Sequence, residues 1–277
     1  MRIAAALWRS SHPGPTVVVT VLALALGASV GVDAGRLAVL VASVLLGQLS
    51  IGISNDVIDA PRDRISGRTD KPLARGDAPT RVAWIAAWST LVGALALSAL
   101  LGWQLALAHA IFVGSGWAYN AWLKSTVFSA ACFVIGFGVF PSLAPLALPD
   151  PHAAPPWAWI AGAALGLAVH FSNVLPDLED DARTGVRGLP HRLGRRASAG
   201  VAAGALITGA TAVVVGSAGA AAPTVLSWGF FAAVVGVAVW GLVAALTRPP
   251  ERLVFRLVMA AALLLAAQLV LAGNLGI

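Results

Sequence analysis

The chain has 277 residues, of which 58% are hydrophobic and 11% carry a formal charge, and a soluble domain of this size needs more polar surface than that. This composition indicates an integral membrane protein. The net charge of +6 does not indicate a nucleic-acid partner, because the charged residues lie in loops between hydrophobic stretches, and the single cysteine excludes a disulfide framework or a cysteine-based metal site.

Nine apolar segments follow one another along the chain. A helix needs about 20 mostly apolar residues to cross a bilayer, and Gly, Pro and polar residues mark the intervals between the segments. We therefore predict an all-α fold, with nine transmembrane helices around a central cavity and a single domain over residues 1–277. The expected spans are 13–31, 35–60, 81–101, 104–122, 126–147, 156–178, 197–219, 224–246 and 253–273.

The basic residues predict how these spans are oriented. If the N-terminus is cytoplasmic, nine spans place every Lys and Arg except Arg36 on the cytoplasmic side. This arrangement satisfies the positive-inside rule. We expect a multi-pass protein of the cell membrane, with its polar loops in the cytoplasm and its C-terminus outside.

Oxygen-bearing side chains recur at every fourth position at the ends of the second and sixth predicted spans. Residues four apart share one face of a helix, so each set forms a ladder. The repeated pattern, with its neighbouring serines Ser54 and Ser172, suggests two related helical units, about 1–125 and 126–277. The first ladder is Asn55, Asp59 and Asp63, and the second is Asn173, Asp177 and Asp181.

The chemistry of the ladders predicts a metal and a polyanion. Carboxylate and amide oxygens suit Mg²⁺, which is commonly shared between protein carboxylates and substrate phosphates. Two ladders would hold Mg²⁺ ions that bridge a diphosphate, although acidic residues at a single helix end are more often simply solvated or paired. Flanking acids are Asp56, Glu179 and Asp180, and basic residues available to the phosphates are Arg68, Lys71, Arg75, Arg187 and Arg192.

Tyr119 and Lys124 form a third candidate group at the cytoplasmic end of the fourth span. In a functional interpretation Lys124 closes over the diphosphate, and Tyr119 hydrogen-bonds it or stabilises positive charge through its ring. Asn120 is a weaker candidate. An interfacial aromatic belt and a snorkelling lysine explain the same residues without a substrate.

Small residues predict close helix packing at Gly162 with Gly166 and at Gly200 with Gly204. His170, just before the second ladder, is expected in the core, with the lining of an acceptor pocket as an alternative.

These motifs resemble those of the UbiA-type intramembrane prenyltransferases, over essentially the whole chain. Lys71 stands where many members of that family have arginine, which keeps the charge but loses the planar fork. The matching elements are residues 54–63 as the NxxxDxxxD motif, Arg68-Thr69 and Lys71-Pro72-Leu73 in the loop that follows, 177–181 as the DxxxD motif with its loop to Gly194, and Tyr119 to Lys124.

The resemblance implies an isoprenoid diphosphate as substrate, with Asp59, Asp63, Asp177 and Asp181 catalytic through Mg²⁺, and Arg68, Lys71, Tyr119, Lys124 and Arg192 on the substrate. The partners are then an isoprenoid diphosphate, an aromatic or other lipophilic acceptor, and membrane lipid. Two alternatives stay open. A terpene cyclase of the same superfamily would need no acceptor, and a transporter would place its acidic groups near the membrane midplane.

Overall fold

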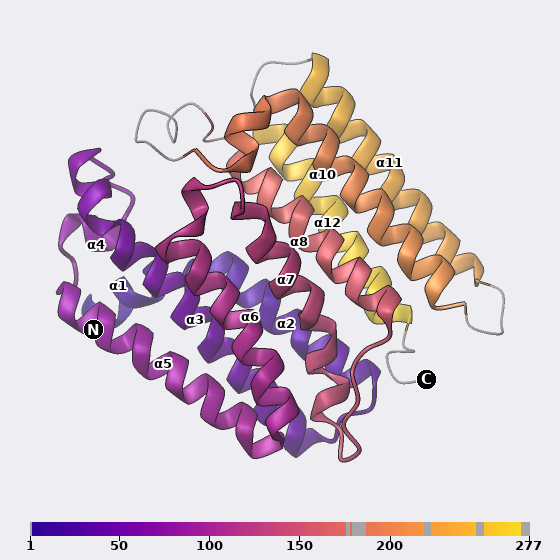
Figure 1. Ribbon diagram of the computed structural model, residues 1–277, viewed down its shortest axis with the longest axis horizontal. Coiled ribbons are helices and arrows are strands. Elements are labelled where there is room, and N and C mark those ends of the chain that lie inside the picture. The colour runs from indigo at the N-terminus through magenta and orange to yellow at the C-terminus, as the bar shows by residue number, and fades with distance from the viewer. Residues whose placement is uncertain (1, 176–177, 179–186, 219–222, 248–251, 273–277) are drawn as a thin grey trace. The chain divides into compact units, whose positions relative to one another are not determined.

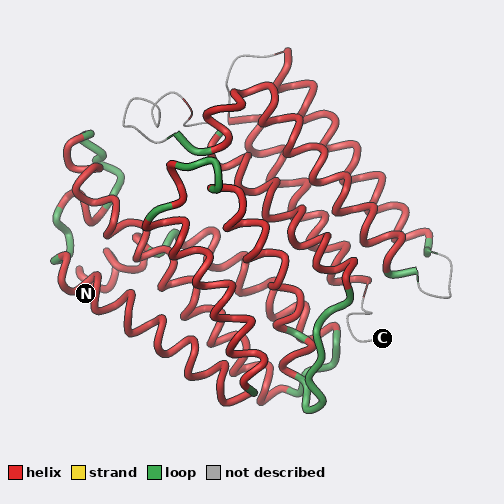
Figure 2. Tube along the Cα trace, in the orientation of Figure 1, coloured by secondary structure: helices red, strands yellow, loops and turns green. Residues whose placement is uncertain are grey.

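A computed structural model describes residues 2–175, 178, 187–218, 223–247 and 252–272. Every regular element in these ranges is a helix (Figures 1 and 2). This confirms the all-α class. The chain divides into two compact units: unit 1 comprises 1–122 and 143–152, and unit 2 comprises 123–142 and 153–277.

Unit 1 is built around one long helix, α3 (Ala34–Ile65). It packs against α2, α5 and α6, and the short α4 lies against its end. The other elements of this unit are α1 (Arg2–Ser10), α2 (Pro13–Ser29), α4 (Pro72–Arg75), α5 (Thr80–Leu101), α6 (Trp103–Ala121) and the 3₁₀ helix η3 (Pro145–Ala147).

Helix α3 begins at an N-cap and extends beyond the end of its apolar segment. The carboxylate of Asp33 accepts hydrogen bonds from the backbone N–H groups of Gly35 at 3.0 Å and Arg36 at 3.1 Å, which satisfies two donors that a helix start leaves open. The helix continues five residues past the predicted end at 60, through Pro61. The whole first ladder therefore lies on one helix.

Arg36, the exception to the predicted charge asymmetry, has a structural role in unit 1. Its guanidinium donates to the backbone carbonyls of Ala147 at 2.6 Å, Leu101 at 3.0 Å and Leu148 at 3.2 Å. The end of α5 and the segment around η3 leave these carbonyls without helical partners, and an arginine fork can satisfy several of them at once. Arg36 thereby joins three segments that are distant in sequence.

In unit 2, α8 (Pro156–Val174) packs against α7, α10 and α12, and α11 packs against α10 and α12. Three boundaries differ from the prediction. The segment 126–147 is interrupted after α7 by 3₁₀ turns at Pro141 and Pro145, α8 ends at Val174, and α10 starts at Leu189. The other elements are η1 (Leu123–Ser125), α7 (Ser129–Val139), η2 (Phe140–Leu143) where the chain passes to unit 1, α10 (Leu189–Gly216), α11 (Val225–Thr247) and α12 (Arg252–Ala272).

One of the two predicted glycine contacts is confirmed. A Cβ at Gly162 would lie 2.1 Å from the carbonyl oxygen of Phe137, and one at Gly166 would lie 2.3 Å from that of Phe133, so only glycine lets α7 approach α8 this closely. A Cβ at Gly200 or Gly204 would meet nothing within 4 Å. The packing interpretation of that second pair is wrong, because spacing alone does not tell which face of a helix has a neighbour.

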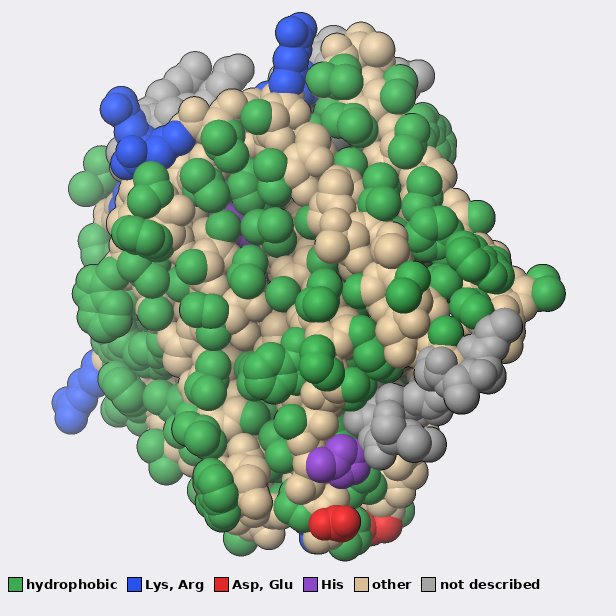
Figure 3. Space-filling model, turned by 45° about the vertical axis from the view of Figure 1, so that its right-hand side comes forward, with side chains coloured by type: hydrophobic (Ala, Val, Ile, Leu, Met, Phe, Trp, Pro, Cys, Tyr) green, Lys and Arg blue, Asp and Glu red, His purple; other side chains and the backbone are tan. Residues whose placement is uncertain are grey.

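The apolar character of the helices supports a multi-pass membrane protein. Five described helices, α3, α5, α8, α10 and α11, are long and apolar enough to cross a bilayer, and the pair α1 and α2, bent by 69°, adds a sixth if it is one span. In α5 only 17% of the apolar window is buried and in α11 only 28%, against 61% in α8. Hydrophobic side chains cover much of the face in Figure 3, a surface that suits lipid rather than water. Each of the nine predicted segments contains helix, but nine spans remain a prediction.

Candidate active site

The first ladder lies on the last three turns of α3. Asp63 is buried, with 5% of its surface exposed, and the charge of Asp59 acts on it. Arg62 lies between them, with its terminal nitrogen 3.4 Å from Asp59 Oδ2 and 3.8 Å from Asp63 Oδ1. Two neighbouring carboxylates that share one arginine over distances this long carry charge that favours binding of a further cation.

Asn120 on α6 fixes the amide of Asn55. Its side-chain oxygen accepts a hydrogen bond from Asn55 Nδ2 at 3.1 Å, while its own Nδ2 donates to Ile51 O at 2.9 Å and Ser54 Oγ at 3.0 Å. Asn120 is 3% exposed, so these bonds form out of solvent. Because the NH₂ group of Asn55 is engaged, its Oδ1 is the atom left to accept or to ligate.

Asp56, beside the ladder, is the centre of a second polar group. Lys71 Nζ donates to its Oδ1 at 2.7 Å and His12 Nε2 lies 3.1 Å from the same atom. Asp56 is 2% exposed. A Cβ at Gly52, one turn earlier on α3, would lie 2.2 Å from the carbonyl oxygen of Ser11, so this glycine lets the chain before His12 approach α3.

The predicted phosphate ligands of the α3–α5 loop are paired with carboxylates in the structure. Arg68 makes a bidentate contact with Asp70, at 2.9 Å from Nε and 2.8 Å from Nη2, and hydrogen bonding from Arg68 lowers the pKa of Asp70 to about 2. Arg75 donates from Nε and Nη2 to one oxygen of Asp77, Oδ2, and from Nη1 to Thr69 O at 2.7 Å. Both pairs are exposed, so an anionic substrate could replace the carboxylates at low cost.

Only the start of the second ladder is described. Asn173 is exposed on the last turn of α8, and Asp177 and Asp181 lie outside the described residues, as do the flanking Glu179 and Asp180. Below Asn173 the buried His170 contacts Ser129 Oγ through Nε2 at 3.1 Å, and the same hydroxyl accepts from Leu189 N at 3.0 Å. His170 thus joins α7, α8 and the start of α10, as expected of a core residue.

The remaining candidates lie in both units. Tyr119 is half-buried on α6 of unit 1, and Lys124 is half-buried in η1 of unit 2. Arg192 is exposed on the first turn of α10 and donates through Nε to Arg187 O at 3.2 Å. Each unit thus supplies part of the predicted residue set.

The donor set of α3 fits a hard divalent cation. Asn55, Asp59 and Asp63 offer amide and carboxylate oxygens on successive turns, which Mg²⁺ prefers to nitrogen or sulfur. The described residues contain no group of three or more His, Cys, Asp or Glu side chains around one point. Two carboxylates and an amide therefore need further oxygens from substrate or water, as is usual for Mg²⁺.

Sequence reasoning missed His12 and undervalued Asn120. His12 has a left-handed backbone, with φ of 55°, at the bend between α1 and α2, and no fixed spacing relates it to Asp56. One feature of the sequence pointed to Asn120: it is an amide at the polar end of an apolar segment. Its partners lie on another helix, so only the fold reveals them.

The fold and the apolar helices define a multi-pass, all-α membrane protein. The chain belongs to the UbiA prenyltransferase family, whose model matches residues 16–264. This confirms the resemblance seen in the motifs.

Solved structures share the fold at low identity. A digeranylgeranylglyceryl phosphate synthase is 14% identical, with 99% of each chain covered and a TM-score of 0.74. A UbiA homologue from Archaeoglobus fulgidus bound to GPP and Mg²⁺ is 14% identical, covering 96% of this chain and 99% of that one at a TM-score of 0.72. The apo structure of a homologue from Aeropyrum pernix K1 is 16% identical, covering 98% of each chain at 0.73. No curated protein matches the sequence.

Proposed function

We propose that the chain is a Mg²⁺-dependent intramembrane prenyltransferase that moves an isoprenoid group from its diphosphate to a lipophilic, aromatic acceptor. The observation that carries the proposal is the oxygen ladder Asn55, Asp59 and Asp63 on one helix, with a basic loop directly after it. The relative from Archaeoglobus fulgidus that is bound to GPP and Mg²⁺ supports the substrate class and the metal.

In the proposed mechanism, one set of residues binds Mg²⁺ and a second set contacts the diphosphate. Asn55, Asp59 and Asp63 would hold Mg²⁺ together with Asn173, Asp177 and Asp181, and bound Mg²⁺ would supply the positive charge that makes diphosphate a good leaving group. Arg68, Lys71, Tyr119, Lys124 and Arg192 contact the diphosphate. The allylic carbon–oxygen bond breaks with its electron pair on the diphosphate, and the acceptor supplies the pair for the new bond and releases a proton.

Helices α5 and α11 favour a substrate that enters from lipid. In both helices only a minority of the apolar window is buried, so an isoprenoid chain can remain in an apolar medium while its charged head stays at the polar ends of the helices.

Product analysis tests the reaction type. The purified chain in lipid nanodiscs is incubated with geranyl diphosphate and Mg²⁺, with and without a phenolic lipid. We expect diphosphate release and a prenylated phenol only when the acceptor is present. A cyclic hydrocarbon or alcohol formed without acceptor would assign the cyclase reaction, and no product from a panel of isoprenoid diphosphates would contradict both.

The proposed orientation places the N-terminus and the loop after α3 in the cytoplasm. The substitutions Ser66→Cys and Ala153→Cys put single reactive thiols on two exposed loops, because the native Cys132 is buried. An impermeant thiol reagent should label Ser66→Cys only from the cytoplasmic side and Ala153→Cys only from the other. Labelling of both from one side contradicts the nine-span topology.

A further inference from the structure

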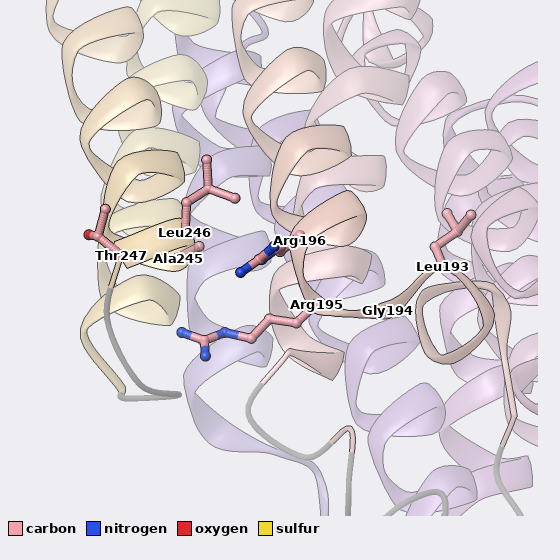
Figure 4. Close-up of a pocket in the computed structure, with 7 residues that line it drawn as sticks. All are labelled: Leu193, Gly194, Arg195, Arg196, Ala245, Leu246 and Thr247. Carbon is pink, nitrogen blue, oxygen red and sulfur yellow. The ribbon is translucent and has the colours of Figure 1, made fainter.

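A pocket of about 460 Å³ in unit 2, between α10 and the end of α11, is lined by no residue of either ladder. Two arginines enter it side by side, and the other lining groups are the Gly194 backbone, aliphatic side chains and one hydroxyl. Figure 4 shows both guanidinium groups extending from α10 beside the last turn of α11. The lining residues are Leu193, Gly194, Arg195, Arg196, Ala245, Leu246 and Thr247.

A break in α10 creates the position of these arginines. Gly194 has φ of 75° and ψ of 171°, which interrupts the helical path and which only glycine adopts without strain. The helical backbone resumes at Arg195 and runs to Gly216. Its positive end therefore lies at the pocket and adds to the charge of the two guanidinium groups.

The charge of Arg196 is available to an anion in the pocket. Within the described part of the chain, Arg196 has no hydrogen-bond or ion-pair partner. Thr247 uses its hydroxyl hydrogen on Val243 O of its own helix at 2.7 Å. Two neighbouring arginine forks match the oxygens of a phosphate, to which they can donate several parallel hydrogen bonds.

The apolar residues of the lining favour a phosphate that is carried by a lipid over inorganic phosphate. Leu193 and Leu246, on either side of the arginines, are 44% and 47% exposed. Helix α11 is long and apolar enough to span a membrane and ends at Thr247, so the pocket lies where such a span meets water. Basic pockets between transmembrane helices on the cytoplasmic side bind anionic head groups, because that leaflet carries the anionic lipids.

We infer that the pocket between α10 and α11 binds a phosphate group, carried by an anionic phospholipid. The arginines contact the phosphodiester, and Leu193 and Leu246 contact the glycerol and the first methylene groups. None of the lining residues is among those proposed to contact the diphosphate, and the inference does not depend on that proposal. Its occupation would fasten the broken start of α10 to the end of α11.

Binding to the purified chain in a neutral detergent tests the inference without any turnover. The probes are short-chain phosphatidylglycerol, phosphatidylcholine of the same chain length and inorganic phosphate, each followed by the shift in Tm and by native mass spectrometry. The variants are Arg196→Gln, the double variant Arg195→Gln/Arg196→Gln and Arg196→Lys. The matched control is Arg256→Gln, which removes an exposed arginine of α12 in the same unit.

We expect phosphatidylglycerol to bind at least about tenfold more tightly than phosphatidylcholine, the scale of one charge-assisted hydrogen bond or more. The preference for phosphatidylglycerol should fall in Arg196→Gln and vanish in the double variant. It should be unchanged in Arg256→Gln, and Arg196→Lys should keep only part of it, because lysine lacks the planar guanidinium fork. If inorganic phosphate binds as well and displaces the lipid, the phosphate site stands and its source is free phosphate.

Equal binding of the two lipids with no binding of phosphate overturns the inference. An undiminished preference for phosphatidylglycerol in Arg196→Gln also overturns it. This single variant gives a result even if the double variant fails to fold.

Discussion

Helices α3 and α8 each carry an asparagine that opens an acidic ladder, but they end differently. α3 continues through its ladder to Ile65, and Asn120 and Lys71 attach its polar turns to other segments. α8 ends at Val174, one residue after an exposed Asn173. The buried contacts of α8 are instead made one turn earlier, by His170 with Ser129.

The neighbours of the first ladder orient part of it within unit 1. In unit 1 the amide of Asn55, a candidate metal ligand, is already oriented, because its Nδ2 donates to Asn120, which is itself held by a hydrogen bond to Ser54. In the described part of unit 2, a buried polar contact lies one turn before Asn173, between His170 and Ser129. Under the proposed function, the first ladder would bind Mg²⁺ with little rearrangement, because part of it is already oriented.

The largest expected effect comes from removing one carboxylate of either ladder. Asp59→Ala and Asp177→Ala should each lower turnover at least about a hundredfold, since even a residue that only supports a metal ligand contributes about 10–100-fold. The fold should persist, as measured by circular dichroism and Tm, because the apo-protein does not need these charges. Asp150→Asn, an exposed acid in a loop, is the control. Near-normal turnover in Asp177→Ala would mean that only unit 1 holds the metal.

Lysine substitutions separate phosphate binding from local pairing. Lys71→Gln and Lys124→Gln should each weaken binding of an isoprenoid diphosphate by about 1.5–3 kcal/mol, the range for a hydrogen bond to a charged group. Isothermal titration measures the effect, and Arg81→Gln, an exposed residue at the start of α5, controls for a general loss of positive charge.

Lys71 needs a further control because it contacts the buried Asp56 at 2.7 Å. If Lys71→Gln lowers Tm but leaves diphosphate binding unchanged, and if Asp56→Asn suppresses that loss of stability, then Lys71 only joins the loop to α3. The proposed phosphate contact would be wrong.

Asn120 tests whether the first ladder is oriented in advance. Asn120→Leu should raise the Mg²⁺ concentration for half-maximal activity by about tenfold, because Asn55 loses the bond that directs its Oδ1. Saturating Mg²⁺ should restore most of kcat, whereas a purely structural defect would lower Tm without changing the metal dependence. Ser115→Ala, which removes a half-buried hydroxyl elsewhere on α6, is the control.

The smallest expected effect is at the exposed pair of Arg68 and Asp70. Asp70→Asn should tighten diphosphate binding by no more than about fivefold, since it frees Arg68 from a surface ion pair worth about 0–1 kcal/mol. The lowered pKa of Asp70, about 2, sets the sign of the pH dependence. The pair stabilises the fold fully above the ordinary aspartate pKa of about 3.9, and this contribution is lost as the pH falls through about 2.

The difference in Tm between the protein and Asp70→Asn measures that contribution. It should be constant from pH 7 to about pH 5 and disappear near pH 2. A difference that grows as the pH falls would contradict the pairing.

The sequence by itself determined the helical class, the membrane character and the ladder of α3. Each follows from local regularities: apolar segments long enough to cross a bilayer, few charges, and oxygen side chains at a spacing of four. The family motifs are equally local, which is why the family was recognised from them and then confirmed over residues 16–264.

Only the tertiary structure decided which polar groups meet. Asn120 with Asn55, His12 with Asp56, and Arg36 with the carbonyls of Ala147 and Leu148 are pairs far apart in sequence. Spacing along one helix gives the face on which a residue lies but not the neighbour across it, as the empty surroundings of Gly200 and Gly204 show. Which face is covered depends on the packing of the helices, and packing is a property of the whole fold.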